Sequence, residues 1–216
     1  MTAAVRVAAL DSRAEFAPPS DWVGRFGLPD CDDTLYVPHF VEASAVLCER
    51  LDTDLEWRDE NIRLFGRSIR APRRSACYGD AGVVYRYSNV AHAARPWPPL
   101  IRDLHSRLQR CIGARFNFVL ANRYRDGSDS MGWHSDDERE LGPSPIIASI
   151  SFGATRPFRF RARDDSGRRA AVALECGSLL LMWGRSQRCW QHALPKVRAA
   201  TGLRINLTFR DVRPRP

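Results

Sequence analysis

The stretch MGWHSDDE, residues 131–138, decides how the fold of this chain is interpreted. It places His134 two residues before Asp136, and side chains at positions i and i+2 of a β-strand point to the same side. An imidazole and a carboxylate that project together supply two of the three ligands of a 2-His-1-carboxylate site, which suits non-haem Fe(II). Because such a pair is common by chance, it predicts a metal site only if a third ligand follows.

The candidate for the third ligand is His192, which lies 56 residues after Asp136 on an expected late strand. An antiparallel barrel brings early and late strands side by side, so the two strands can be neighbours. Neutral imidazoles and a carboxylate suit Fe(II). Zinc remains an alternative, since histidine and aspartate also bind it.

The stretch LRINLTFR, residues 203–210, alternates polar and apolar side chains, as a strand with two different faces does. Two arginines on a face that points into a barrel are costly unless an anion lies between them. A small dicarboxylate would pair with both guanidinium forks. The alternative is a strand whose polar face meets water. The polar face carries Arg204, Asn206, Thr208 and Arg210.

The remaining pattern predicts a mainly β fold with flanking helices (α+β). A helix is expected over 97–113, with prolines in its first turn and Gly113 at its end, and another over 41–51. Short strands separated by turn residues indicate a sandwich or barrel rather than a parallel α/β sheet. These strands are expected near 116–122, 131–135, 146–153, 157–162, 171–175, 178–183, 189–193 and 203–209.

Charge is distributed unevenly along the 216 residues. Residues 1–60 carry 5 basic and 13 acidic side chains, whereas residues 61–216 carry 28 basic and 12 acidic ones. A basic body of this kind suggests a polyanionic partner, and nucleic acid comes first. We find no membrane-length apolar run and no secretory signal, and the six scattered cysteines form no zinc or disulfide pattern. We therefore expect an intracellular protein, cytoplasmic if bacterial and nuclear if eukaryotic.

The segment 64–87 interleaves aromatic residues with arginines, which is typical of surfaces that stack bases and hold phosphates. Phe65 precedes Gly66 in an expected tight turn, where an exposed ring could wedge into a base stack. Tyr85 and Tyr87 alternate along a strand and so share one face. The alternative is that Phe65 folds into the core and that the tyrosines only pack.

These motifs, in this order over about residues 60–212, resemble the AlkB family of Fe(II)/2-oxoglutarate-dependent dioxygenases, and in particular its branch that acts on double-stranded DNA. The resemblance implies a double-stranded β-helix, or jelly roll, at about 115–212. It also implies a nucleotide-recognition lid at about 60–90 within a domain of residues 37–216. The resemblance does not extend to residues 1–35, and we expect residues 1–36 to form a loosely ordered acidic leader.

The resemblance also implies a role for each motif residue. The residues implied to be catalytic are the iron ligands His134, Asp136 and His192, together with Arg204. The resemblance implies that Arg204 lies near the target base. It implies that Arg210 binds the distal carboxylate of 2-oxoglutarate. The residues implied around 2-oxoglutarate are Asn122, Tyr124, Arg204, Asn206, Thr208 and Arg210. Those implied to bind substrate are Phe65, Arg73, Tyr85, Tyr87, Asp137 and Glu138.

The activity implied is oxidative dealkylation of DNA. O2-dependent decarboxylation of 2-oxoglutarate would drive hydroxylation of N-alkyl lesions, such as N1-methyladenine and N3-methylcytosine, and release formaldehyde. We expect a monomer without membrane contact that acts on alkylated duplex DNA, with single-stranded DNA, RNA or another non-DNA substrate as alternatives. A metal-free nucleic-acid-binding module is an alternative of another class. Two departures concern the base pocket: Tyr87 stands where Phe is expected, and Trp133 where a smaller or charged residue is expected.

Overall fold

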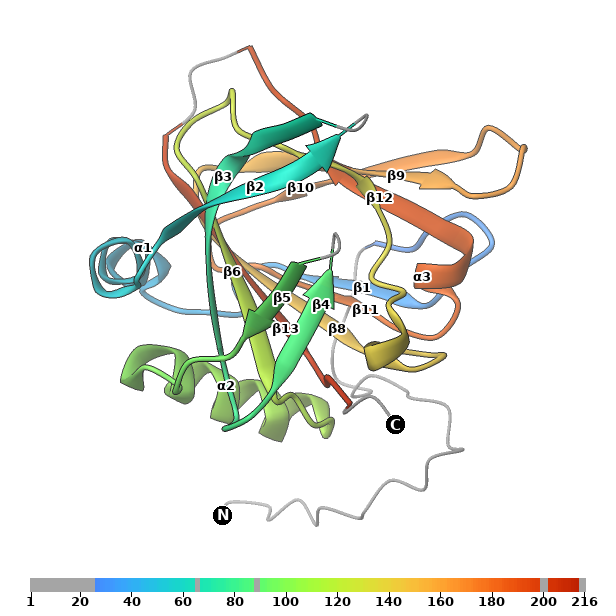
Figure 1. The fold of residues 1–216 in the computed structure, drawn as a ribbon. Coiled ribbons are helices and arrows are strands. Elements are labelled where there is room, and N and C mark those ends of the chain that lie inside the picture. The colour runs from blue at the N-terminus through green and yellow to red at the C-terminus, as the bar shows by residue number, and fades with distance from the viewer. Residues whose placement is uncertain (1–25, 65–66, 88–89, 199–201, 214–216) are drawn as a thin grey trace.

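A computed structural model describes residues 26–64, 67–87, 90–198 and 202–213. Its framework is a seven-stranded antiparallel sheet (Figure 1). In order across this sheet the strands are β1 (Thr34–Val37), β11 (Leu179–Met182), β8 (Ile147–Gly153), β13 (Arg204–Arg210), β6 (Phe118–Tyr124), β3 (Arg67–Gly79) and β2 (Arg58–Leu64).

A four-stranded antiparallel sheet packs against the inner face of the seven-stranded one. It contains β10 (Arg169–Leu174), β9 (Arg156–Ala162), β12 (Trp190–Leu194) and β7 (Met131–His134), in that order. Phe118 and Leu180 of the large sheet belong to the same buried cluster as Phe160 and Trp190 of the small one. Two antiparallel sheets around one interior form the jelly roll that the family resemblance implies.

Two helices cover the outer face of the large sheet, α1 (Ser44–Asp54) and α2 (Pro99–Ile112) (Figure 1). The prediction of a helix at 97–113 is confirmed, and the helix ends at Gly113, where φ is 71° and the N–H donates to the Gln109 carbonyl over 2.8 Å. Helix α1 begins three residues later than expected. Ala43 has a left-handed conformation, and the Val41 N–H donates to the Gly177 carbonyl instead.

The fold begins earlier than the expected boundary at residue 36. Strand β1 pairs with β11, with Leu35 opposite Leu181, and so forms one edge of the large sheet. Leu28 and Cys31 are buried in the core between the sheets. Residues 26–36 are therefore part of the domain, and residues 1–25 lie outside the described part of the chain.

The lid region consists of two hairpins. Strand β3 pairs with β2 over its first half and with β6 over its second half, so the first hairpin grows directly out of the large sheet. Strands β4 (Val84–Tyr87) and β5 (Val90–Ala93) form a separate two-stranded sheet. The helices in the described ranges are too short or too polar to cross a membrane.

Candidate active site

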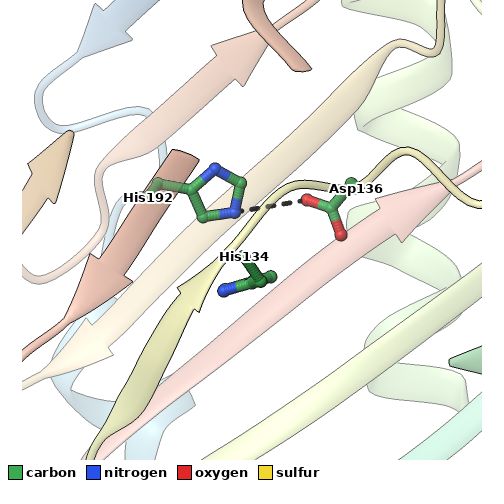
Figure 2. A group of neighbouring side chains, drawn as sticks. All are labelled: His134, Asp136 and His192. Atoms are coloured by element: carbon green, nitrogen blue, oxygen red, sulfur yellow. Dashed lines mark ion pairs between the residues drawn. The ribbon is translucent and has the colours of Figure 1, made fainter. Parts of the chain in front are cut away.

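The three predicted metal ligands meet between β7 and β12 (Figure 2). His134 and His192 are direct register partners in this antiparallel pair, and Asp136 follows the end of β7. Their ligand atoms lie within 4.8 Å of one another, and His192 Nε2 is 3.5 Å from Asp136 Oδ2. Cross-strand pairing thus joins ligands that are 56 residues apart in the sequence.

The protonation states of this group are those that a metal ion requires. Burial disfavours the charged form of Asp136, but the Arg210 guanidinium and then the imidazoles outweigh it and lower the pKa to about 2. Burial and the neighbouring His134 lower the pKa of His192 to about 3. Burial likewise lowers the pKa of His134. An ionised carboxylate and two neutral imidazoles therefore face one another near neutral pH.

Further residues fix the orientation of the ligands. His134 Nδ1 donates to the Gly132 carbonyl over 2.9 Å, which leaves Nε2 as the free base. The Phe158 ring stacks on His192 with 5.2 Å between centroids. Gln187, on the short helix α3 (Ser186–Cys189), accepts the Asp136 N–H over 2.9 Å. No sequence motif marks Gln187, whereas Phe158 belongs to an alternating strand next to the site.

The polar face of β13 points into the interior, not into water. Arg204, Thr208 and Arg210 are buried, and Asn206 lies opposite Asn122 of β6 and Ser151 of β8. A cavity reaches from this face to the metal ligands. Besides those ligands it is lined by Leu120, Asn122, Tyr124, Met131, Ser149, Phe158, Met182, Asn206, Thr208 and Arg210. The sequence-based prediction did not include Ser149 and Ser151 of β8, although these serines alternate with apolar residues as the polar residues of β13 do.

Arg204 is a buried cation whose described hydrogen bonds go to neutral groups. It is 2% exposed and donates to Ser151 Oγ over 2.8 Å and to the Leu174 carbonyl over 3.3 Å. Its Nε is buried without a hydrogen-bond partner among the described residues. Burial lowers the pKa of Arg204 to about 10. A buried guanidinium that is bonded only to neutral groups is suited to bind the carboxylate of a ligand.

Arg210 is already engaged by a metal ligand. Its Nε donates to Asp136 Oδ1 over 3.1 Å, and its Nη2 contacts the same oxygen. Arg210, rather than Arg204, therefore lies at the metal end of the cavity. Arg204 is six residues earlier, at the opposite end of β13.

Tyr85 connects the lid to the metal centre. Its hydroxyl donates to Glu138 Oε2 over 2.7 Å, and the Arg210 guanidinium lies 5.2 Å from its ring centroid. Burial and then Asp136 raise the pKa of Glu138. Asp137, which the resemblance also implies at the base, forms an ion pair with Arg163 at 2.6 Å. The two neighbouring acids thus have different partners.

The other predicted substrate residues occupy different places. Arg73 is 5% exposed and its Nε donates to Asn122 Oδ1 over 3.1 Å, so it joins the group expected around the cosubstrate. Phe65 lies outside the described residues. Trp133 alternates with His134 on β7 and therefore points away from the ligands, where the Arg161 guanidinium lies 4.6 Å from its ring centroid. This position gives Trp133 no part in the wall of the cavity.

The residues fit iron and 2-oxoglutarate as they stand. Two neutral imidazoles and one carboxylate leave further coordination positions open, as non-haem Fe(II) oxygenases require. The Nε of Arg204, buried in the same interior, has no hydrogen-bond partner in the described part of the chain, and it fits a diacid. Zinc would use the same ligands but would leave the buried guanidinium without a function.

Comparisons with known proteins agree with this chemistry. The sequence model described as the 2OG-Fe(II) oxygenase superfamily matches residues 33–210. DNA oxidative demethylase ALKBH2 of Mus musculus is 42% identical over 160 residues, which cover 71% of this chain and 67% of that protein. The Homo sapiens ALKBH2 is 40% identical over 191 residues, which cover 83% of this chain and 73% of that protein.

Two further proteins extend the comparison. Alpha-ketoglutarate-dependent dioxygenase alkB homolog 3 of Homo sapiens is 39% identical over 190 residues, covering 83% of this chain and 66% of that protein. The solved structure of OsALKBH1 aligns with a TM-score of 0.56 at 18% identity, covering 82% of this chain and 97% of that one, which shows the shared fold. This chain therefore belongs to the AlkB family of the 2OG-Fe(II) oxygenase superfamily and is an Fe(II)- and 2-oxoglutarate-dependent dioxygenase.

Proposed function

We propose that this protein is an oxidative DNA demethylase that acts as a monomer on N-alkylated bases, such as N1-methyladenine and N3-methylcytosine, in duplex DNA. The observation that carries the proposal is the combination of a His-Asp-His centre, the buried Arg204 whose Nε has no hydrogen-bond partner among the described residues, and Tyr85 of the expected lid, which donates to Glu138 next to the metal ligands. The names of the relatives from mouse and human, DNA oxidative demethylases at 42% and 40% identity, support DNA as the substrate.

The chain's own residues prepare the site for this reaction. Iron held by His134, Asp136 and His192 supplies, with O2 and 2-oxoglutarate, the oxidation of the methyl group. Arg210 keeps Asp136 ionised and in one orientation through its contacts with Oδ1. We assign the distal carboxylate of 2-oxoglutarate to Arg204, because Arg210 already contacts Asp136, whereas Arg204 has no carboxylate partner among the described residues.

The remaining cosubstrate residues complete a hydrogen-bonding wall. Asn206 donates to Ser149 Oγ over 2.8 Å and accepts from Thr208 Oγ1 over 2.8 Å, so its amide is fixed in place. Arg73 holds Asn122 on the neighbouring strand. A wall fixed in this way orients a bound diacid without reorganisation when the reaction begins.

The lid supports recognition of a base that has left the helix. A methyl group on a pairing nitrogen weakens base pairing, so such a base costs less to flip out. Tyr85 presents a ring above Arg210, and Glu138 presents an acid to a cationic base. The basic residues of positions 61–216 provide charge for the phosphate backbone.

A panel of methylated oligonucleotides tests the proposal, with formaldehyde and succinate as readouts. Duplex DNA, single-stranded DNA and RNA of one sequence would each carry N1-methyladenine or N3-methylcytosine. We expect formaldehyde release that needs Fe(II) and 2-oxoglutarate and that is fastest on duplex DNA. Faster turnover of RNA would make RNA the substrate, and succinate without formaldehyde from any oligonucleotide would contradict nucleic-acid demethylation.

A further inference from the structure

A half-buried polar cluster backs the outer tyrosine of the lid. Glu60 of β2 accepts a hydrogen bond from the Tyr87 hydroxyl at 2.8 Å and lies 3.3 Å from His92 Nδ1. The His92 and Tyr87 rings stack with 4.2 Å between centroids and 14° between planes. The cluster thus joins strands β2, β4 and β5, and the sequence alone marks neither Glu60 nor His92.

The cluster keeps the negative charge of Glu60 close to the rings. The side chains of His92 and Glu60 are only 9% and 19% exposed. Burial lowers the pKa of His92, which leaves this ring neutral near pH 7. No arginine in the described ranges forms an ion pair with Glu60, whereas Asp59 next to it pairs with Arg70 at 2.5 Å.

The rings of the lid form one continuous wall. Tyr85 lies directly opposite His92 in the β4–β5 pair, and the Tyr85 and Tyr87 centroids are 5.6 Å apart. Tyr85 reaches Glu138 beside the metal ligands, so the wall begins at the metal centre and ends at Glu60. A base that contacts this wall would have the carboxylate group of Glu60 behind it.

We propose that Glu60, acting through Tyr87 and His92, is a specificity-determining residue that makes the base-binding wall favour cationic over neutral methylated bases. The inference rests on the proposed function of the site. A hydrogen bond from a phenol to a carboxylate makes the phenol ring more electron-rich, and such a ring attracts a cation on its face more strongly. The carboxylate of Glu60, which forms no ion pair with an arginine among the described residues, acts in the same direction, and the nearby Arg73 opposes it in part.

The methylated bases themselves provide the contrast. N3-methylcytosine is a cation near neutral pH, whereas N3-methylthymine is a neutral pyrimidine that differs from it by a carbonyl oxygen in place of the amino group and by a 5-methyl group. An uncharged wall would stack both bases with similar strength. A wall backed by Glu60 would hold the cation more tightly, and the difference would appear in KM because the contact exists before the reaction begins.

Glu60→Gln tests the inference, since it removes the charge and keeps an oxygen that accepts from Tyr87. We expect the ratio of kcat/KM for N3-methylcytosine over N3-methylthymine to fall about fivefold, through KM for the cationic base and with kcat retained. Tyr87→Phe removes the hydrogen bond and should lower the ratio in the same way. The matched control is Glu56→Gln, because Glu56 is 74% exposed and pairs with Arg95 at 2.9 Å.

The outcomes separate this inference from the proposed function. An unchanged ratio in both Glu60→Gln and Tyr87→Phe would overturn the inference, as would an equal fall in the Glu56→Gln control. Binding affinities for the two oligonucleotides, measured alongside turnover, provide a second cation-to-neutral ratio that does not depend on the catalytic step. If the wild-type protein binds both oligonucleotides but releases no formaldehyde, the demethylase proposal fails, and the affinity ratios of the variants still decide the role of Glu60.

Discussion

Replacing Arg204 by methionine should weaken cosubstrate binding and stabilise the empty protein at the same time. The side chain is 2% exposed, its described hydrogen-bond acceptors are a hydroxyl and a carbonyl, and its Nε has no partner in the described chain. The lowering of its pKa to about 10 corresponds to a burial cost of about 3 kcal/mol. Methionine has a similar length and removes this cost.

The two effects have opposite signs and separate assays. Loss of the charge-assisted pair with the distal carboxylate should cost about 3 kcal/mol, or roughly a hundredfold in KM for 2-oxoglutarate, measured by succinate formation. The lost hydrogen bonds to Ser151 and Leu174 offset part of the gain in stability, which leaves about 1 kcal/mol. For a chain of this size that gain raises Tm by about 2–4 °C in the metal-free protein.

The combination of results is what tests the role of Arg204. Arg159→Met serves as the control, since Arg159 is exposed on β9, and it should change neither KM nor Tm. An unchanged KM for 2-oxoglutarate together with a lower Tm would refute the reasoning, because Arg204 would then be a structural residue. An increase in KM with a lower Tm would show that the hydrogen bonds to Ser151 and Leu174 outweigh the burial cost.

Three further predictions concern the ligands and the lid. His134→Ala should abolish Fe(II)-dependent formaldehyde release and reduce metal affinity in calorimetry; full turnover would contradict the metal assignment. The stability of the metal-free protein should fall as the pH drops from about 6.5 to 2, because the unfolded chain binds protons at His192 and Asp136 at a higher pH than the folded protein does. Asp136 accounts for about 2 kcal/mol of this loss. A Tm that does not change with pH over this range would exclude the linkage. Phe65→Ala should slow repair of duplex DNA selectively, and equal slowing on single strands would argue against a wedge.

The sequence predicts the face of β13 that lines the site because this strand alternates strictly between polar and apolar residues. Burial on one side of β13 forces its polar residues onto the other, so the face that meets the cosubstrate follows from the order of residues alone. The period does not tell which end of the strand lies at the metal. That end depends on the register with β6 and β8, and the fold places Arg210 beside Asp136.

Other features depend on contacts that no local pattern encodes. Strand β1 has four residues among prolines and acids, and it becomes a strand because β11 offers it an edge. Glu60, Tyr87 and His92 meet from three strands, and neither Glu60 nor His92 has a periodic or motif signal. Trp133 is explained once β9 places Arg161 over its outer face.

The pairing of β1 with β11 also has a consequence for solubility. Strand β11 reads Leu-Leu-Leu-Met and is completely buried. A chain that started at residue 38 would keep every active-site residue and yet expose the backbone donors and acceptors of this apolar strand. Bare apolar edges recruit strands from other molecules. The first described residues therefore protect the enzyme from aggregation, and shortening the chain at its N-terminal side should be judged by light scattering before it is judged by activity.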